Sequence, residues 1–349
     1  MIAGVLSTLA TGFGAGLGIR HLQKTGVAVE SVLGLVLLVA GLALLGFATV
    51  TIWRVLRSWW RLVLLPAAVF CLAVVISLAL AAMFTFVPRT ELGSTTPADR
   101  GLAYSDVTFA ATDGITLSAW LIPSTNHAAV ILLHGAGSNR TATLAHAVVL
   151  VRHGYGVLMV DARGQGRSGG GGMDIGWYGD QDSGGALAFL QRRSDVDPTR
   201  IAILGLSMGG EEAIGAAAAH RAIRAVIAEG ATQRTAADKA GWLPGGFGGS
   251  IQRGLDRLTY GMTALLTAAR QPIPLHDAIA KASGTPFLLI AAGRKPDETK
   301  AANYFRSAAP DRISVWTVPG ANHTGALQTD PQQWESHVIT FLNRALGTS

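Results

Sequence analysis

The chain has 349 residues, enough for one large α/β domain with an additional segment. Hydrophobic residues make up 49% of it and charged residues only 14%, which is apolar for a soluble protein. The net charge is +6, and residues 1–90 account for most of it, with six basic residues and one acidic residue. The rest of the chain contains 22 basic and 21 acidic residues. The charge pattern therefore indicates membrane flanks and argues against a nucleic-acid surface. The single cysteine, Cys71, excludes an intrachain disulfide.

Three apolar stretches occupy residues 1–88. Residues 31–52 and 62–87 carry no charge and reach the roughly 20 residues that a bilayer requires, so both are expected to span a membrane. Residues 2–19 are uncharged but rich in glycine, and indicate either a third span or an apolar segment of borderline length. A cleaved signal peptide is disfavoured because no basic residues follow Met1 directly.

Arginine and tryptophan residues predict the orientation. The loop between the two longer stretches, residues 53–61, contains three arginines beside three tryptophans. By the positive-inside rule we expect this loop in the cytoplasm and the domain after the last span on the extracytoplasmic side of a bacterial cell membrane. Arg20 and Lys24 argue against this orientation, because the same topology places them on the extracytoplasmic side. Residues 89–103 contain Pro, Gly, Ser and Thr and are expected to be a linker.

Residues 104–349 alternate short apolar stretches with helix-compatible ones, which predicts an α/β domain with a mostly parallel sheet. Residues 104–110 and 115–122 are expected to form an antiparallel hairpin that opens the sheet. The buried strands are expected at 129–133, 155–160, 201–205, 225–228, 287–291 and 313–318. Residues 231–281 break the rhythm with an apolar insertion containing Gly and Pro, typical of either a cap over a pocket or a connecting pair of helices.

The sequence Gly205-Leu206-Ser207-Met208-Gly209 contains the GxSxG pattern. An apolar, strand-like stretch precedes it and a Gly- and Ala-rich, helix-compatible stretch follows it, which is the context of a nucleophile elbow. A side chain at either glycine would crowd the sharp turn that holds the serine hydroxyl above the sheet. Ser207 is therefore the candidate nucleophile.

Three further motifs each follow a predicted strand. They are His134-Gly135-Ala136-Gly137, Asp161-Ala162-Arg163-Gly164 and Gly320-Ala321-Asn322-His323-Thr324-Gly325. With the GxSxG pattern, they make the chain from about residue 104 onward resemble the esterase- or lipase-like serine hydrolases of the α/β-hydrolase superfamily. With its apolar N-terminal part, the whole chain resembles membrane-anchored bacterial members of that superfamily. The resemblance implies the α/β-hydrolase fold, with helices on both faces of the sheet.

The resemblance also implies a catalytic triad in the chain order serine, acid, histidine. It assigns Ser207 as the nucleophile and His323, in the loop after the last strand, as the base. The acid is expected in the loop after strand 287–291 as Asp297, because aspartate is the usual residue type there. Its neighbour Glu298 is an alternative, and so is Glu229, at the end of strand 225–228.

Two backbone N–H groups are expected to form an oxyanion hole. One belongs to Met208, and the other to Ala136 or Gly137 in the loop after strand 129–133. His134 is expected to brace that loop rather than to act as an acid or base. The motif that begins with Asp161 is expected to fix its own loop through an ion pair and a turn.

These residues predict acyl transfer through a covalent intermediate on Ser207, with small-molecule or lipid esters as substrates and membrane lipids as the other partner. An acyltransferase with the same triad and a non-catalytic membrane scaffold are the alternatives. No cofactor is expected, and no compact group of His, Asp and Glu has the spacing of a metal site. The natural substrate and the oligomeric state are left open.

Overall fold

The computed structural model describes residues 2–348, which form two compact units. The first unit combines the chain up to Pro88 with Pro244–Ala269. The second contains Arg89–Leu243 and the chain from Arg270 onward. The predicted insertion 231–281 therefore contributes to both units.

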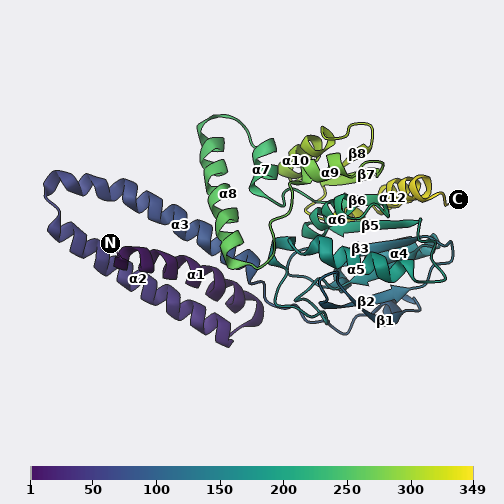
Figure 1. Ribbon diagram of the computed structural model, residues 1–349, viewed down its shortest axis with the longest axis horizontal. Helices are drawn as coiled ribbons and strands as arrows, with labels where there is room; N and C mark the ends of the chain where they lie inside the picture. The colour runs from purple at the N-terminus through teal and green to yellow at the C-terminus, as the bar shows by residue number, and fades with distance from the viewer. Residues whose placement is uncertain (1, 349) are drawn as a thin grey trace. The chain divides into compact units, whose positions relative to one another are not determined.

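An eight-stranded sheet in the order β1-β2-β4-β3-β5-β6-β7-β8 forms the centre of the second unit (Figure 1). Its strands are β1 (Ser105–Ala110), β2 (Thr116–Ile122), β3 (Ala129–Leu133), β4 (Gly156–Val160), β5 (Ile201–Leu206), β6 (Ile223–Glu229), β7 (Phe287–Ala292) and β8 (Ile313–Val318). β2 pairs antiparallel with β1 and with β4, and every other pairing is parallel. The prediction of a mostly parallel sheet opened by a hairpin is confirmed.

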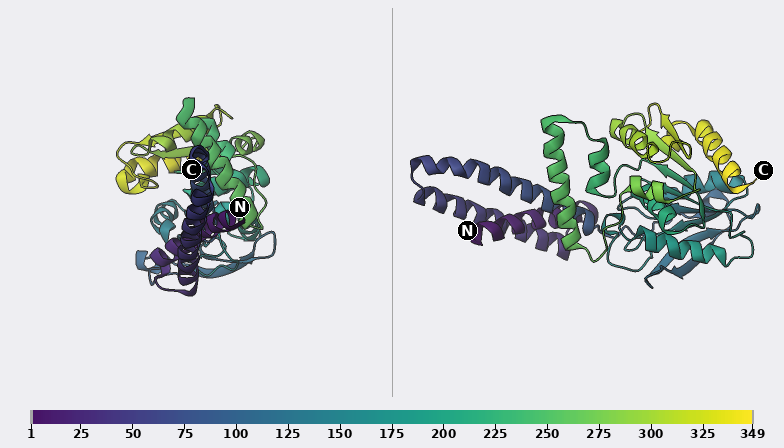
Figure 2. Two further views of the ribbon diagram at one scale, coloured as in Figure 1. Left: turned by 90° about the vertical axis from the view of Figure 1, so that its left-hand side faces the viewer. Right: turned by 45° about the horizontal axis from the view of Figure 1, so that its top comes forward.

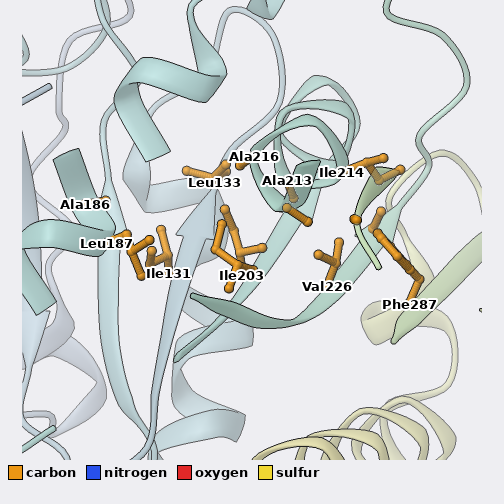
Figure 3. Packing of buried hydrophobic residues seen from close by; sticks show 14 of the residues in the cluster. Ile131, Leu133, Ala186, Leu187, Ile203, Ala213, Ile214, Ala216, Val226 and Phe287 are labelled. Atoms are coloured by element: carbon orange, nitrogen blue, oxygen red, sulfur yellow. The ribbon is translucent and has the colours of Figure 1, made fainter. Parts of the chain in front are cut away.

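Helices cover both faces of this sheet. On one face lie α4 (Leu144–Arg152), α11 (Ala326–Thr329) and α12 (Pro331–Leu346), and on the other α5 (Gly179–Gln191), α6 (Met208–Ala219), α9 (Leu275–Lys281) and α10 (Pro296–Arg306). Alternate residues of a strand point to opposite faces, so Ile131 packs with the α5 and α6 side while Val130 packs with the α4 and α12 side. Figure 3 shows Ile203 below Ala213 and Ala216 of α6, and Ile131 beside Leu187 of α5.

Shorter elements connect these layers. They are the helix α7 (Ala236–Trp242) and the 3-10 helices η2 (Pro97–Arg100), η3 (Arg140–Thr143) and η4 (Asp174–Gly176).

The first unit is helical: α1 (Ile2–Thr25), α2 (Val29–Val55), the 3-10 helix η1 (Ser58–Val63), α3 (Leu64–Thr85) and α8 (Gly246–Leu266). Among the described residues, three helical segments are long and apolar enough to cross a membrane: Ile2–Thr25, Val29–Val55 and Trp59–Thr85. The first apolar stretch, whose length was borderline in the sequence, thus forms a helix that is also long enough to cross a membrane. The views in Figure 2 show α1, α2 and α3 lying side by side.

Glycine residues allow α1 to approach both of its neighbours. A Cβ atom on Gly34 of α2 would lie 2.3 Å from the backbone nitrogen of Gly18. A Cβ atom on Gly16 would lie 2.3 Å from the carbonyl oxygen of Ala79 in α3. Because lipid gives no hydrophobic drive for helix association, such close backbone packing of small residues is what holds apolar helices together.

A buried ion pair joins the loops that follow β3 and β4. Arg140 Nη2 lies 2.7 Å from Asp161 Oδ2, and both side chains are fully buried. The same carboxylate accepts the backbone N–H groups of Arg140 at 2.8 Å and of Arg167 at 2.9 Å. The expectation that Asp161 fixes its loop through an ion pair agrees with this geometry, and its partner comes from the preceding loop.

We expect Asp161→Ala to destabilise the protein by about 3–5 kcal/mol, because it removes the buried counter-charge of Arg140 and leaves only the half-exposed carboxylate of Asp106, 3.7 Å from Nη1. Thermal unfolding of the full chain in detergent measures this as a lower Tm. Glu335→Gln is the matched control, since it breaks a pair with Arg152 that is 58% and 34% exposed and should cost less than about 1 kcal/mol. Equal losses in the two variants would contradict the prediction.

Candidate active site

Ser207 occupies the turn between β5 and α6 with φ 55° and ψ −120°, a backbone conformation that non-glycine residues rarely adopt. A Cβ atom on Gly205 would lie 2.0 Å from the carbonyl oxygen of Gly209, and one on Gly209 would lie 2.6 Å from the carbonyl oxygen of Leu133. The Ser207 N–H donates to the carbonyl oxygen of Glu229 at 2.7 Å. Both glycines are thus required by close backbone contacts, and the elbow geometry expected from the sequence is present.

Ser207, His323 and Glu298 form a continuous hydrogen-bonded chain. Ser207 Oγ lies 2.8 Å from His323 Nε2, and His323 Nδ1 lies 2.7 Å from Glu298 Oε1. When Nδ1 donates to the carboxylate, Nε2 carries the lone pair that can accept the serine proton. The three residues follow β5, β8 and β7, so the parallel sheet brings them together at its carboxyl edge.

The acid behind the imidazole is Glu298, which corrects the sequence-based choice of Asp297. Both residues lie in the first turn of α10, where neighbouring side chains point about 100° apart, so only one can face His323. Glu298 is buried and also accepts the N–H of Ala292 at 2.8 Å. Asp297 is exposed and pairs with Lys300 at 3.1 Å.

The other alternative acid, Glu229, braces the loop that carries the histidine. Its buried carboxylate accepts the N–H of Ala326 at 2.9 Å and the indole N–H of Trp334 at 3.1 Å. Burial raises the pKa of Glu229. The structure therefore brings Glu229 close to the site but directs its oxygens to the segment after His323 instead of to the ring.

The surroundings of His323 favour the protonated form of its imidazole more than water does. The hydrogen bond with Glu298 raises the pKa of His323 above its ordinary value near 6.5, although partial burial opposes the shift. Glu211, in the first turn of α6, adds a smaller contribution in the same direction. Glu211 is itself buried, and this desolvation raises its pKa to about 7, while the N–H groups of Thr232 and Gln233 oppose the shift by donating to it.

The loop after β3 lies against the nucleophile. A Cβ atom on Gly135 would lie 3.3 Å from Ser207 Cβ, and Ala136 lines the same cavity as Ser207. His134 Nε2 accepts the N–H of Ala162 at 3.1 Å, so Nδ1 carries the proton and donates to the carbonyl oxygen of Gly135 at 2.9 Å. His134 thus braces the loop, in agreement with its expected role.

Of the expected oxyanion donors, Met208 is the first residue of α6, where a backbone N–H has no partner within its own helix. Ala136 lines the cavity. The carbonyl oxygen of Gly137 accepts the Thr90 hydroxyl at 2.9 Å. Which of the two N–H groups, that of Ala136 or that of Gly137, is the second donor stays a prediction.

Residues 89–91, expected to belong to a linker, are bound to the active-site loops. Arg89 Nη1 donates to the carbonyl oxygens of Gly166 and Ser168, each at 2.8 Å. The backbone N–H of Thr90 donates to Gln165 Oε1 at 2.8 Å. These contacts leave no residue-type signal in the sequence, because they are made largely to backbone atoms.

The cavity beside Ser207 has a volume of about 340 Å³, and polar residues contribute to its wall, namely Ser138, His146, Thr324 and Gln328. His146 is fully buried, and burial lowers its pKa to about 4, so the ring is neutral near pH 7. Neither ring nitrogen has a hydrogen-bond partner among the residues that the structure describes. The ring packs edge-on against Trp334. A lone histidine in a helix gave no signal by which the sequence could reveal this position.

No group of three or more His, Cys, Asp or Glu side chains that could hold a metal ion occurs within residues 2–348.

A mostly parallel sheet of eight strands with helices on both faces and a strained serine after β5 is the α/β-hydrolase fold, as predicted. Residues 124–277 match the family model described as Hydrolase_4: serine aminopeptidase, S33. The second unit therefore has the α/β-hydrolase fold.

Relatives and solved structures extend this comparison. A protein of Salmonella typhi named YfhR, described as uncharacterized, is 31% identical over 137 residues, 38% of this chain and 45% of that protein. The polyketide transferase ATR5 of Stachybotrys chlorohalonatus is 35% identical over 128 residues, 35% and 43% of the two chains. A structure of the Pyrococcus furiosus esterase Pf2001 superposes with a TM-score of 0.57 at 25% identity, covering 74% of this chain and 99% of that one. The chain spans less than half the length of these curated relatives.

The two carboxylates of the first turn of α10 can be distinguished by activity. We expect Glu298→Gln to lower kcat by up to about 10⁴-fold, because the imidazole loses the partner that sets its tautomer and stabilises its cation. Asp297→Asn is the matched control and should leave kcat near wild type, since the Asp297 side chain is 65% exposed and pairs with Lys300. Ester hydrolysis by the full chain in detergent measures both. A larger loss in the Asp297 variant would refute the assignment.

The pH dependence of kcat/KM gives a separate prediction. His323 accepts a proton only when neutral, so activity rises with pH through the pKa of His323, which Glu298 raises. Glu298→Gln removes that cause, and the acid limb should therefore move to lower pH even though the plateau falls. Rates measured between about pH 5 and pH 9 report the limb. A limb that stays in place or moves upward would show that Glu298 does not act on His323.

Proposed function

We propose that this protein is a membrane-anchored serine hydrolase that cleaves carboxylic esters through an acyl-enzyme on Ser207. The observation that carries the proposal is the chain of short hydrogen bonds from Ser207 Oγ through His323 to Glu298. A serine hydroxyl is a weak nucleophile without an adjacent base, and this arrangement supplies one.

In the proposed reaction His323 Nε2 takes the proton of Ser207 as Oγ attacks the ester carbonyl carbon. The N–H group of Met208 and one N–H group of the loop after β3 stabilise the oxyanion of the tetrahedral intermediate, each contributing about 3 kcal/mol. His323 then protonates the leaving alcohol. Water, deprotonated by the same ring, attacks the acyl-enzyme and releases the acid. Glu298 orients the ring and stabilises its cation.

Similarity supports ester substrates without naming one. The esterase Pf2001 matches over most of the α/β-hydrolase domain. The family description refers to serine aminopeptidases, so a peptide amide is a competing substrate. The similarity to a polyketide transferase favours the acyltransferase alternative, in which an acceptor alcohol replaces water. Product analysis with added alcohols separates transfer from hydrolysis, since transfer yields a new ester.

Membrane anchoring through α1, α2 and α3 is part of the proposal, supported by the length and apolarity of these helices. Among their exposed side chains, Val39 and Phe47 of α2 are 66% and 69% exposed, as lipid-facing residues would be. Membrane lipids are then the immediate neighbours of the protein. We propose that the hydrolase domain is extracytoplasmic, because the arginines of residues 53–61 favour a cytoplasmic loop.

A fluorophosphonate probe tests whether Ser207 is an activated nucleophile. We expect the full chain in detergent to be labelled and Ser207→Ala to lose the label, with p-nitrophenyl ester hydrolysis lost in parallel. Ser314→Ala, a change on the exposed side of β8, is the control and should retain both. Absence of labelling in a folded wild-type chain would support a non-catalytic scaffold instead.

A further inference from the structure

Helix α8 of the first unit has an apolar face that points outward. Phe247, Ile251, Leu258 and Leu265 follow one another at intervals of four, seven and seven residues, which places them on one side of an α-helix. Phe247 is 84% exposed, Ile251 49% and Leu265 86%. The same side has open space around it, because a Cβ atom on Gly254 or Gly261 would meet nothing within 4 Å.

The opposite side of α8 is polar and buried. Asp256, Tyr260 and Thr263 are 8%, 5% and 0% exposed. In a helix on the surface of a water-soluble protein the apolar stripe faces the core and the polar residues face solvent. α8 shows the reverse arrangement. In water, each large apolar side chain left exposed would forgo about 1.5–3 kcal/mol of the free energy gained by burial. The outer surroundings of this helix are therefore expected to be apolar.

The position of α8 within its unit identifies those surroundings. α8 packs against α3, one of the three helices long and apolar enough to cross a membrane, and Figures 1 and 2 show it running across α3. A helix that contacts a membrane span lies in or at the bilayer. Spanning is disfavoured because Arg253, Asp256 and Arg257 lie in its middle, and each charge at the centre of a bilayer costs at least about 2.5 kcal/mol.

We propose that α8 is an interfacial membrane helix whose Phe247, Ile251, Leu258 and Leu265 lie in the boundary between lipid headgroups and acyl chains. An amphipathic helix in the plane of the interface keeps its apolar side in the acyl boundary and its charged residues near water. This makes the insertion between β6 and β7 a second membrane contact, separate from the three spans. The inference depends on the proposed membrane anchoring.

Site-directed spin labelling of the full chain in phospholipid nanodiscs tests it. Cys71→Ser removes the one native cysteine, and single cysteines are then introduced at Phe247 and Leu265. Exposed positions on another side of α8, Ser250 and Arg257, serve as matched controls. Val39 of α2 serves as the lipid reference. Collisions with oxygen, which is enriched in lipid, are compared with collisions with a water-soluble nickel complex.

We expect labels at Phe247 and Leu265 to favour oxygen, as at Val39, and labels at Ser250 and Arg257 to favour the nickel complex. If Val39 favours oxygen while Phe247 and Leu265 match Ser250, α8 faces water and the inference is wrong. Protection of Phe247 and Leu265 from both reagents would mean that protein, such as a second copy, covers the stripe, which also overturns it. If Val39 itself favours the nickel complex, the proposed anchoring fails first.

Discussion

The active site depends on the close backbone contact where β5 turns into α6. Gly205 and Gly209 approach within a distance that no side chain would permit, and this forces Ser207 into a positive φ. The strained residue is held by a hydrogen bond to the neighbouring strand β6 and by a helix packed on the sheet. The hydroxyl lies 2.8 Å from His323 Nε2 at the sheet edge, so the position of the candidate nucleophile depends on a steric constraint on the backbone.

Around this turn, charged and polar side chains hold the loops mainly through backbone atoms. Glu298 accepts the N–H of Ala292 as well as contacting His323, and Glu229 accepts the N–H of Ala326 just beyond it. Asp161 performs the same task for the loops after β3 and β4, and Arg89 does so for residues 166–168. Loops at the carboxyl edge would otherwise be mobile, and catalysis requires them within a fraction of an ångström.

The helices of the first unit pack differently from those of a domain in water, as the proposed membrane anchoring would require. α1 and α2 meet through glycines, and α8 buries polar residues while exposing apolar ones. In water such an arrangement would be unfavourable, whereas in lipid the apolar surface costs nothing and polar groups gain by facing other protein. Under the proposed membrane anchoring, lipid surrounds the first unit and water the second, which accounts for a composition that is apolar overall.

The sequence by itself determined the elements whose signal is local: the apolar strands, the long apolar helices, and the glycines and serine of the elbow. It also predicted His323 as the candidate base, because the loop after the last strand is defined by chain order. Only the tertiary structure decided between Asp297 and Glu298, since adjacent residues of one helix turn carry the same chemistry and differ only in the direction they face. The placement of Glu229 and Arg89 was decided in the same way, because each rests on contacts with atoms distant in the sequence. The residue type determines the chemistry that a side chain can perform, and the packing of the chain determines which side chains come into contact.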